Sequence, residues 1–337
     1  MLLTLPFLTL ITLLLSKSIL ITGVAGFLGS HLAEFLLAEG HSITGIDNFD
    51  PFYAEEIKRK NISTCMSNPN FNLLELDIRN ADQLNAIVGH WDILVHIAAK
   101  AGVLPSVKNP HDYVSVNING TMNLLEFLRE RGIKKYVFAS SSSIYGNNKE
   151  TPFEETEKVD GPISPYAFTK RSGELMNYTY HQLYQIDILN LRLFTLYGPR
   201  QRPDLSIHKF TKLIQNGEPI EMYGDGSTAR DYTHVSDVVN GFVLAMKYLF
   251  ENEGVYEIIN IGNRNPVKLK ELISLLFELS GKTENIIQKP TQAGDVEITY
   301  ASVAKAEKLL GYAPKMPFKD GLRGFVEWYK ECNNIKA

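Results

Sequence analysis

The sequence is poor in cysteine and contains no block rich in lysine and arginine. Its 337 residues include 2 cysteines, Cys65 and Cys332, which lie far apart and form no metal-ligand spacing. We therefore expect no metal site, and a reduced, cytoplasmic protein is the simplest interpretation. The 34 Lys and Arg residues against 38 Asp and Glu residues give a formal net charge of -4. This mildly acidic balance gives no support for nucleic-acid binding.

Long hydrophobic runs are also scarce, and the exception is the N-terminus. Met1–Leu15 carries no charged side chain, and Lys17 follows it. As a helix it would span about 22 Å, short of the roughly 30 Å hydrocarbon core of a membrane. It lacks the positive start and the small-residue cleavage site of a signal peptide. We treat residues 1–17 as an apolar appendage. It is either a wrongly assigned start or tail, or a weak membrane anchor that leaves the body in the cytosol.

From Ser18 onward, short apolar runs alternate with stretches of helical spacing. Strands that are apolar on both faces and separated by helices predict a doubly wound, Rossmann-like parallel sheet covered on both sides. The expected strands are Ile19–Thr22, Ser42–Ile46, Phe71–Leu76, Ile93–Ile97, Tyr136–Ala139, Ile186–Leu193 and Tyr256–Ile261. The expected helices are Leu28–Leu37, Leu84–Val88, Tyr113–Arg129 and Tyr166–Leu183.

The α/β rhythm changes near Pro199, where Gly, Pro and Asp become frequent. This change predicts two units. Residues 18–198 would form the dinucleotide-binding domain, and residues 199–337 would form mainly a smaller substrate-binding lobe. Within the second part, residues 235–262 are expected to return to the first domain.

A glycine fingerprint lies at the first expected strand-to-helix turn, where Gly23, Gly26 and Gly29 frame Phe27 and Leu28. The first glycine permits a tight turn, the second lets the backbone approach a pyrophosphate, and the third lets helix and strand pack closely. The helix N-terminus adds free N–H donors. A glycine-rich turn without a ligand is the alternative.

The ends of the following strands support the dinucleotide interpretation. Asp47 and Asn48 suit the hydroxyls of an adenosine ribose, and a carboxylate there would repel a 2′-phosphate, so NAD is favoured over NADP. Asp77 and Ile78 would flank the adenine, although Asp77 could equally cap the next helix. After the fourth strand, the small residues Ala98 and Ala99 leave room for the cofactor. Lys100 follows them and is either a cofactor contact or a solvated loop residue.

Tyr166 and Lys170 form a YxxxK motif in an expected helix. Positions i and i+4 share a helix face, so the ammonium can lie near the phenol. A nearby cation favours the phenolate and makes tyrosine a usable general base. Alone the motif is weak, because surface pairs with this spacing are common.

Together with SSSSIYG at Ser140–Gly146, these motifs resemble the extended short-chain dehydrogenase/reductase family, the NAD-dependent nucleotide-sugar epimerases and dehydratases. The resemblance covers nearly the whole chain from Ser18. It implies catalytic roles for Ser141, Tyr166 and Lys170, with Ser141 relaying a sugar hydroxyl proton to Tyr166. It also places Asn117, Tyr166 and Lys170 among the cofactor contacts.

Two serines narrow the reaction. Relatives that dehydrate or decarboxylate nucleotide sugars carry acidic residues where this chain has Ser142 and Ser143. Hydride removal from C4 and its return to the other face is the reaction that remains. The segment Arg192–Asp204 resembles the signature of UDP-glucuronate 4-epimerases. This resemblance implies that Thr195 and Arg202 grip the C6 carboxylate, with Ser142 and Ser143 nearby. Loop arginines near the diphosphate are the alternative.

Three further residues resemble the nucleotide-binding segment of that family. Tyr223 would lie by the uracil, Arg230 would neutralise the diphosphate, and Asp295 would bind the uridine ribose. Gln292 replaces an arginine found in many epimerases of uncharged sugars, so Arg230 would carry more of the diphosphate charge.

The resemblance therefore implies an NAD-dependent 4-epimerase of a UDP-sugar, with UDP-glucuronate favoured. An epimerase of neutral UDP-sugars is the first alternative, and a non-catalytic NAD-binding scaffold or redox sensor is the second. The expected helices Tyr113–Arg129 and Tyr166–Leu183 resemble the pair that forms a dimer interface in this family, which implies a homodimer. Membrane contact is expected only through Met1–Leu15, if at all.

Overall fold

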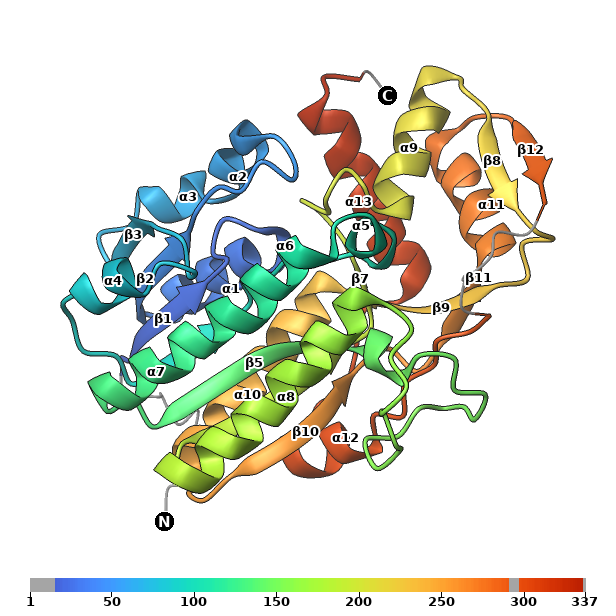
Figure 1. The fold of residues 1–337 in the computed structure, drawn as a ribbon. Helices are drawn as coiled ribbons and strands as arrows, with labels where there is room; N and C mark the ends of the chain where they lie inside the picture. Colours follow the sequence, from blue (N-terminus) through green and yellow to red (C-terminus); the bar gives the residue numbers. More distant parts are fainter. Residues whose placement is uncertain (1–15, 291–296, 336–337) are drawn as a thin grey trace, which may run out of the picture.

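The computed structural model describes residues 16–290 and 297–335 (Figure 1). Its centre is a seven-stranded sheet in the order β10-β6-β5-β4-β1-β2-β3. Every neighbouring pair in this sheet is parallel. The strands are β1 (Ser18–Thr22), β2 (Ser42–Asp47), β3 (Phe71–Glu75), β4 (Ile93–His96), β5 (Lys135–Ser141), β6 (Asp187–Leu193) and β10 (Tyr256–Ile261). The predicted α/β class and all seven predicted strands are confirmed, and no strand end differs by more than two residues.

Helices cover both faces of the sheet, as Figure 1 shows. On one face α1 (Phe27–Ala38), α10 (Val235–Glu251) and α12 (Ala304–Leu310) join residues such as Ile19 and Ile21 of β1 in one core cluster. On the other face α4 (Ala81–Ala86), α7 (Thr121–Arg131) and α8 (Pro165–Tyr184) pack against Leu20. Alternate residues of β1 thus point to opposite cores, which explains why the strand is apolar throughout.

Two of the predicted helices differ from the structure. The helix expected at Leu84–Val88 is α4, which begins earlier because the Asn80 side chain accepts a hydrogen bond from Gln83 N at 3.0 Å. The helix expected at Tyr113–Arg129 consists of α6 (Pro110–Val114), a π-helical turn (Ser115–Gly120) and α7. The wider turn contains Asn117, whose side chain binds other segments, and such turns often lie at functional sites.

Elements of the second half of the chain form a third apolar cluster. Two small sheets have the orders β11-β9-β7 and β12-β8. Their strands are β7 (Thr195–Tyr197), β8 (Ile220–Tyr223), β9 (Ala229–His234), β11 (Pro266–Lys268) and β12 (Ile286–Lys289). Helices α9 (Ser206–Asn216), α11 (Leu269–Ser280) and α13 (Phe318–Cys332) pack with them. The short helices α2 (Glu55–Asn61), α3 (Ser63–Met66) and α5 (Val103–Lys108) complete the fold.

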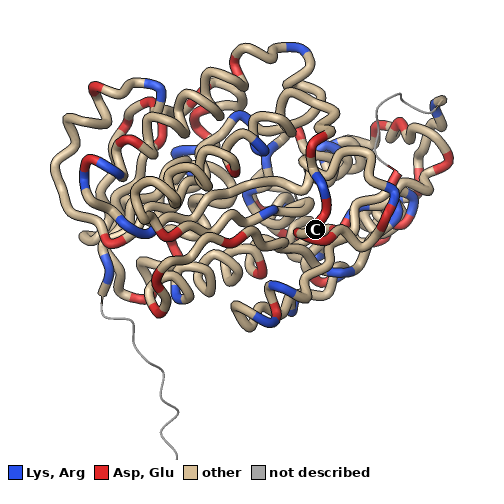
Figure 2. Tube along the Cα trace, turned by 60° about the horizontal axis from the view of Figure 1, so that its bottom comes forward, with Lys and Arg blue, Asp and Glu red and all other residues tan. Residues whose placement is uncertain are grey.

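Charged residues of both signs are interspersed along the described chain (Figure 2), in keeping with the small net charge. Within the described ranges, no helix has both the length and the apolar character needed to cross a membrane. The apolar segment Met1–Leu15 lies outside the described residues.

A buried polar network ties α8 to the sheet. Glu174 of α8 accepts hydrogen bonds from Arg192 Nε and Nη2 of β6, both at 2.9 Å, and from Ser140 Oγ of β5 at 2.7 Å. The side chains of Glu174 and Arg192 are fully buried. Arg192 Nη1 also donates to Tyr145 Oη at 3.0 Å. Ser140 is thus a structural residue at the end of its strand, and the network fixes α8 against β5.

Candidate active site

A pocket of about 500 Å³ opens where the central strands end, between β1, β2, β4 and β5 and the segment after β6. Ligands of doubly wound sheets bind at this edge, where the strand order reverses between β1 and β4. Of the residues expected at the site, the following line the pocket: Gly23, Gly26, Phe27, Leu28, Asp47, Asn48, Asp77, Ile78, Ala98, Ala99, Lys100, Ser141, Ser142, Ser143, Tyr166, Lys170, Thr195 and Arg202.

The glycine turn forms a cradle that only glycines can build. A Cβ on Gly29 would lie 2.2 Å from the Gly23 carbonyl oxygen, and one on Gly23 would lie 2.7 Å from Ala98 N. Gly23 also has a φ of +74°, which favours glycine. This close packing presents the N-terminus of α1 to the pocket, so the turn fits the pyrophosphate of a dinucleotide.

Asp47 lies at the end of β2 and is held by two backbone donors. Ala25 N donates to Oδ2 at 3.0 Å, and Phe49 N donates to Oδ1 at 2.9 Å. Burial raises the pKa of this carboxyl, and the Lys58 cation and the two N–H donors oppose that shift. The carboxylate therefore faces the pocket in a fixed orientation that suits the hydroxyls of a ribose.

Asp77 does not cap the helix that follows it, so the capping alternative is wrong. The cap of α4 is Asn80, whereas Asp77 pairs with Arg79 Nη2 at 2.7 Å. Asn48 Nδ2 also donates to Asp77 Oδ2 at 2.8 Å. Asn48 and Asp77 thus form one polar edge of the pocket.

Lys100 is not a solvated loop lysine. Its ammonium lies 2.9 Å from Asp50 and 3.2 Å from Asp112, and its side chain is 14% exposed. Burial lowers its pKa, but the two carboxylates raise the pKa overall. Asn117, which does not line the pocket, accepts from Lys100 N at 2.8 Å and donates to Thr169 Oγ1 at 3.0 Å. Asn117 therefore connects the lysine loop to α8.

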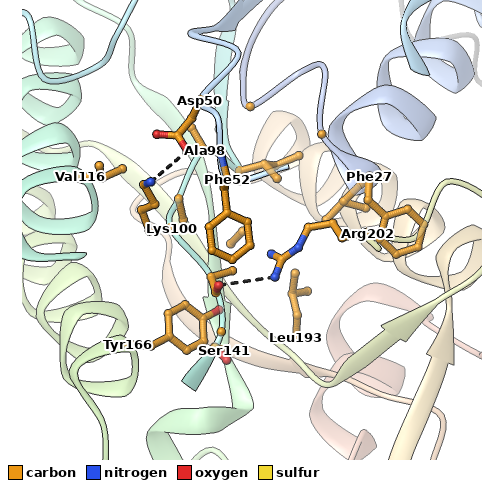
Figure 3. A pocket seen from close by; sticks show the side chains of 18 of the residues that line it. Phe27, Asp50, Phe52, Ala98, Lys100, Val116, Ser141, Tyr166, Leu193 and Arg202 are labelled. Carbon is orange, nitrogen blue, oxygen red and sulfur yellow. Dashed lines mark hydrogen bonds and ion pairs between the residues drawn. The ribbon is translucent and has the colours of Figure 1, made fainter. Parts of the chain in front are cut away.

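Ser141 and Tyr166 lie together in the pocket (Figure 3). Ser141 is the last residue of β5, and Tyr166 is in the first turn of α8, which Ser164 caps by accepting from Ala167 N at 3.1 Å. Burial raises the pKa of the phenol, while a hydrogen bond with Ser141 and the charge of Arg202 lower it. The pair is therefore arranged for proton transfer between a bound hydroxyl, Ser141 and Tyr166.

Lys170 lies one turn further along α8, where its Nζ donates to the Ala139 carbonyl oxygen at 2.7 Å. Burial lowers the pKa of this ammonium to about 7. Of the two cationic residues at the motif tyrosine, it is Arg202 whose charge acts on the pKa of the phenol. The YxxxK motif points to Lys170 as the cation near the phenol, and the structure adds Arg202.

The depressed pKa of Lys170 predicts that Lys170→Met stabilises the unliganded protein. The folded protein resists protonating a lysine that the unfolded chain protonates below about pH 10.4. This penalty is largest below pH 7 and disappears as the pH rises above that unfolded value. At neutral pH we expect Lys170→Met to raise the free energy of unfolding by about 1–3 kcal/mol, after the lost hydrogen bond is taken into account.

Urea unfolding of both proteins near pH 7 and pH 10 measures this effect. The exposed Lys282, in the turn after α11, gives the matched control Lys282→Met, for which no pH-dependent gain is expected. A Lys170→Met variant that is less stable than the parent at neutral pH would contradict the buried-cation account.

The residues expected to bind the C6 carboxylate come from two segments. Ser142 and Ser143 follow β5 in a 3₁₀ turn, and Ser143 N donates to Ser141 Oγ at 3.2 Å. Thr195 begins β7, and Arg202 follows that strand. Arg202 lines the pocket, but Arg200 is bound to Glu34 of α1 at 2.8 Å and does not. The two loop arginines thus have different environments.

Sequence reasoning missed an aromatic and charged segment that follows β2. Asp50, Phe52, Tyr53 and Lys58 line the pocket. Lys58 Nζ donates to the Asp50 carbonyl oxygen at 2.7 Å and lies 4.8 Å from the centre of the Tyr53 ring. The available signal was the aromatic pair Phe52-Tyr53, five and six residues after the expected ribose carboxylate.

The two described residues that were expected to bind the UDP part, Tyr223 and Arg230, do not line the pocket. Tyr223 is partly exposed at the end of β8, its hydroxyl 3.3 Å from Glu221, and Arg230 lies in β9. Asp295 and Gln292 lie outside the described residues.

The fold and the pocket define a dinucleotide-binding enzyme of the short-chain dehydrogenase/reductase type. The model of the NAD dependent epimerase/dehydratase family matches residues 19–262. The chain belongs to this family and depends on NAD.

The relatives are close in sequence and in structure. The chain is 43% identical to a UDP-glucuronate 4-epimerase of Thermodesulfobacterium geofontis, over 93% of this chain and 96% of that one. The UDP-glucuronic acid 4-epimerase of Bacillus cereus, solved with UDP-glucuronic acid and NAD, has a TM-score of 0.86 and 35% identity over 94% and 99% of the two chains. A UDP-glucose 4-epimerase of Thermotoga maritima, solved with UDP-glucose, has a TM-score of 0.85 and 32% identity over 94% and 99%.

Proposed function

We propose that this protein interconverts UDP-glucuronate and UDP-galacturonate by inverting C4 of the sugar. The observation that carries the proposal is the composition of one pocket. It combines Ser141 and Tyr166 with Arg202, and it has serines, without carboxylates, at positions 142 and 143. The T. geofontis and B. cereus relatives carry the same substrate in their names.

Bound NAD would take up the C4 hydride and return it to the other face of the sugar. The chain's own part is to hold the reactants and to move one proton. Gly23, Gly26, Phe27, Leu28 and Gly29 would hold the pyrophosphate, and Asp47 and Asn48 the adenosine ribose. Asp77, Ile78, Ala98, Ala99, Lys100, Asn117, Tyr166 and Lys170 would complete the cofactor site.

The proton would leave the C4 hydroxyl through Ser141 to Tyr166. Oxidation at C4 makes a β-keto acid, which readily loses carbon dioxide. Arg202 and Thr195, with Ser142 and Ser143, would hold the carboxylate away from the alignment that favours this loss. A guanidinium matches a carboxylate with two charge-assisted hydrogen bonds. Because positions 142 and 143 carry no carboxylic acid, elimination is also disfavoured.

The remaining predictions belong to the same proposal. Tyr223, Arg230 and Asp295 would bind the UDP part, and residues 18–198 with 235–262 would form a unit distinct from the rest of 199–337. The predicted homodimer would use the helical stretches 113–129 and 166–183, whose exposed apolar side chains are Met122, Leu175, Tyr178 and Leu183. A cytoplasmic location also stays a prediction.

The proposal is tested by incubating the purified protein with UDP-glucuronate and following UDP-galacturonate by NMR, with UDP-glucose as the competing substrate. Arg202→Ala should reduce kcat/KM for UDP-glucuronate roughly 100-fold or more, because a charge-assisted pair is lost, and should change that for UDP-glucose only slightly. The matched control is Arg323→Ala, which removes an exposed arginine paired with Asp320 on α13. Equal losses on both sugars would refute the carboxylate role, and turnover of UDP-glucose alone would favour the neutral-sugar alternative.

A further inference from the structure

Arg202, which lines the pocket, already carries an ion pair with Asp204. Its Nε donates to Asp204 Oδ1 at 2.9 Å, and its Nη2 donates to Asp204 Oδ2 at 2.7 Å. The side chains of Arg202 and Asp204 are 16% and 36% exposed. Pro203 lies between them and restricts the backbone, so this ion pair with two hydrogen bonds forms at little entropic cost. One edge of the guanidinium is therefore occupied by the protein's own carboxylate.

The other sides of the guanidinium are also defined. The Phe52 ring centre lies 5.0 Å from Arg202 Cζ, and Nη2 approaches the Ala101 carbonyl oxygen at 3.4 Å. Figure 3 shows the end of the Arg202 side chain turned toward Tyr166 and Ser141. Within residues 16–290 and 297–335, no hydrogen bond is made by Nη1. The two N–H groups of Nη1 are thus the part of the guanidinium that a substrate carboxylate can use.

We propose that Asp204 is a specificity-determining residue that weakens the grip of Arg202 on the substrate's carboxylate. This inference rests on the proposed function. A sugar carboxylate bound at Nη1 would share one guanidinium with Asp204, and the two anions would repel each other across it. With a neutral sugar, the same pair spares Arg202 from being buried without a partner.

A moderated grip suits an epimerase. The sugar would present first one face of C4 and then the other to the nicotinamide ring, which accepts the hydride and then returns it, so its C6 carboxylate has to shift during each turnover. A tightly held carboxylate would oppose this movement. Asp204 therefore lowers the affinity of Arg202 for the C6 carboxylate and allows the sugar to move. It also limits the discrimination between acidic and neutral sugars.

The inference is tested with the isosteric variant Asp204→Asn. Calorimetric titrations with UDP-glucuronate and UDP-glucose use NAD-loaded Tyr166→Phe protein, so that turnover does not intervene. Asp204→Asn should lower the Kd for UDP-glucuronate about three- to tenfold, because the repelling charge is removed, and should change the Kd for UDP-glucose less than twofold. With Tyr166 restored, kcat and KM for UDP-glucuronate should both fall.

Two controls accompany this test. Asp320→Asn removes a carboxylate from an exposed arginine pair on α13 and should change neither Kd. In an Arg202→Ala background, Asp204→Asn should no longer tighten UDP-glucuronate. An unchanged Kd for UDP-glucose shows that the variant is folded.

The outcomes separate the inference from the function on which it rests. If the parent prefers UDP-glucuronate but Asp204→Asn leaves that Kd unchanged or raises it, Asp204 merely orients Arg202 and the inference alone is wrong. If the parent and the Asp204→Asn variant both bind the two sugars equally, both the carboxylate role of Arg202 and the inference are wrong.

Discussion

Tyr166→Phe is expected to reduce kcat by about 10³-fold or more, because general-base catalysis commonly contributes 10²- to 10⁴-fold and no second phenol takes over the role. The ring remains, so binding of NAD and of the UDP-sugar should persist. Burial raises the pKa of the phenol, so the base form gains population as the pH rises. In the parent, kcat should therefore increase from about pH 6 to about pH 9. NMR turnover assays and calorimetric binding measure the two properties separately.

The matched control is Tyr113→Phe. The Tyr113 ring packs edge-on against the Tyr166 ring, with 6.2 Å between the ring centres. The Tyr113 hydroxyl donates to the Ala101 carbonyl oxygen at 3.0 Å. It lies beside the reacting group without the proposed proton role, and we expect a loss of less than about tenfold. A Tyr166→Phe protein that retains most of its turnover would remove Tyr166 from the mechanism.

Glu174→Ala is expected to cost about 3–5 kcal/mol of unfolding free energy, because it leaves the buried Arg192 guanidinium without its partner. The loss also frees Ser140 Oγ, next to Ser141. Removing both charges with Glu174→Leu and Arg192→Met should restore most of the stability, since the cost comes from the unpaired charge. Urea unfolding of Glu174→Leu, Arg192→Met and the double variant measures the coupling energy between the two side chains.

Glu278→Ala is the control for this prediction, because Glu278 forms an exposed pair with Lys319. Exposed pairs contribute little, so its effect should stay below about 1 kcal/mol. If the Glu174→Ala and Glu278→Ala variants lose similar stability, the buried network does not anchor α8.

The central sheet could be predicted because its signal is local. Strands such as β1 are apolar on both faces, and β10 was predicted with its observed bounds. The glycine turn and the YxxxK motif are likewise short in sequence. Their placement at one edge follows from the parallel strand order.

Other features depend on contacts between distant segments, which local patterns do not carry. The π-helical turn Ser115–Gly120 interrupts a stretch with good helical spacing, and there Asn117 binds Lys100 and Thr169. The position of Phe52 against Arg202 joins loops 150 residues apart in sequence, at 52 and 202. The partner of Lys170 is a backbone carbonyl, Ala139 O, which no side-chain motif reveals.

The substrate specificity of the pocket could be predicted only in part, because it depends on how side chains are placed in space. Arg202 was expected from its resemblance to a family signature, but its ion pair with Asp204 was not. A two-residue spacing across a proline is common in loops and becomes informative only when both side chains are placed. The charge that the sugar meets is therefore set by the pair, and the arginine alone overstates it.

The most direct test of the proposed reaction is the fate of a deuterium label at C4 of UDP-glucuronate during conversion in ordinary water. If the C4–H bond is broken and remade within the closed site, UDP-galacturonate should retain the deuterium at C4, with no exchange at C5. An epimerised product that carries solvent protium at C4, or that exchanges at C5, would contradict the proposed reaction.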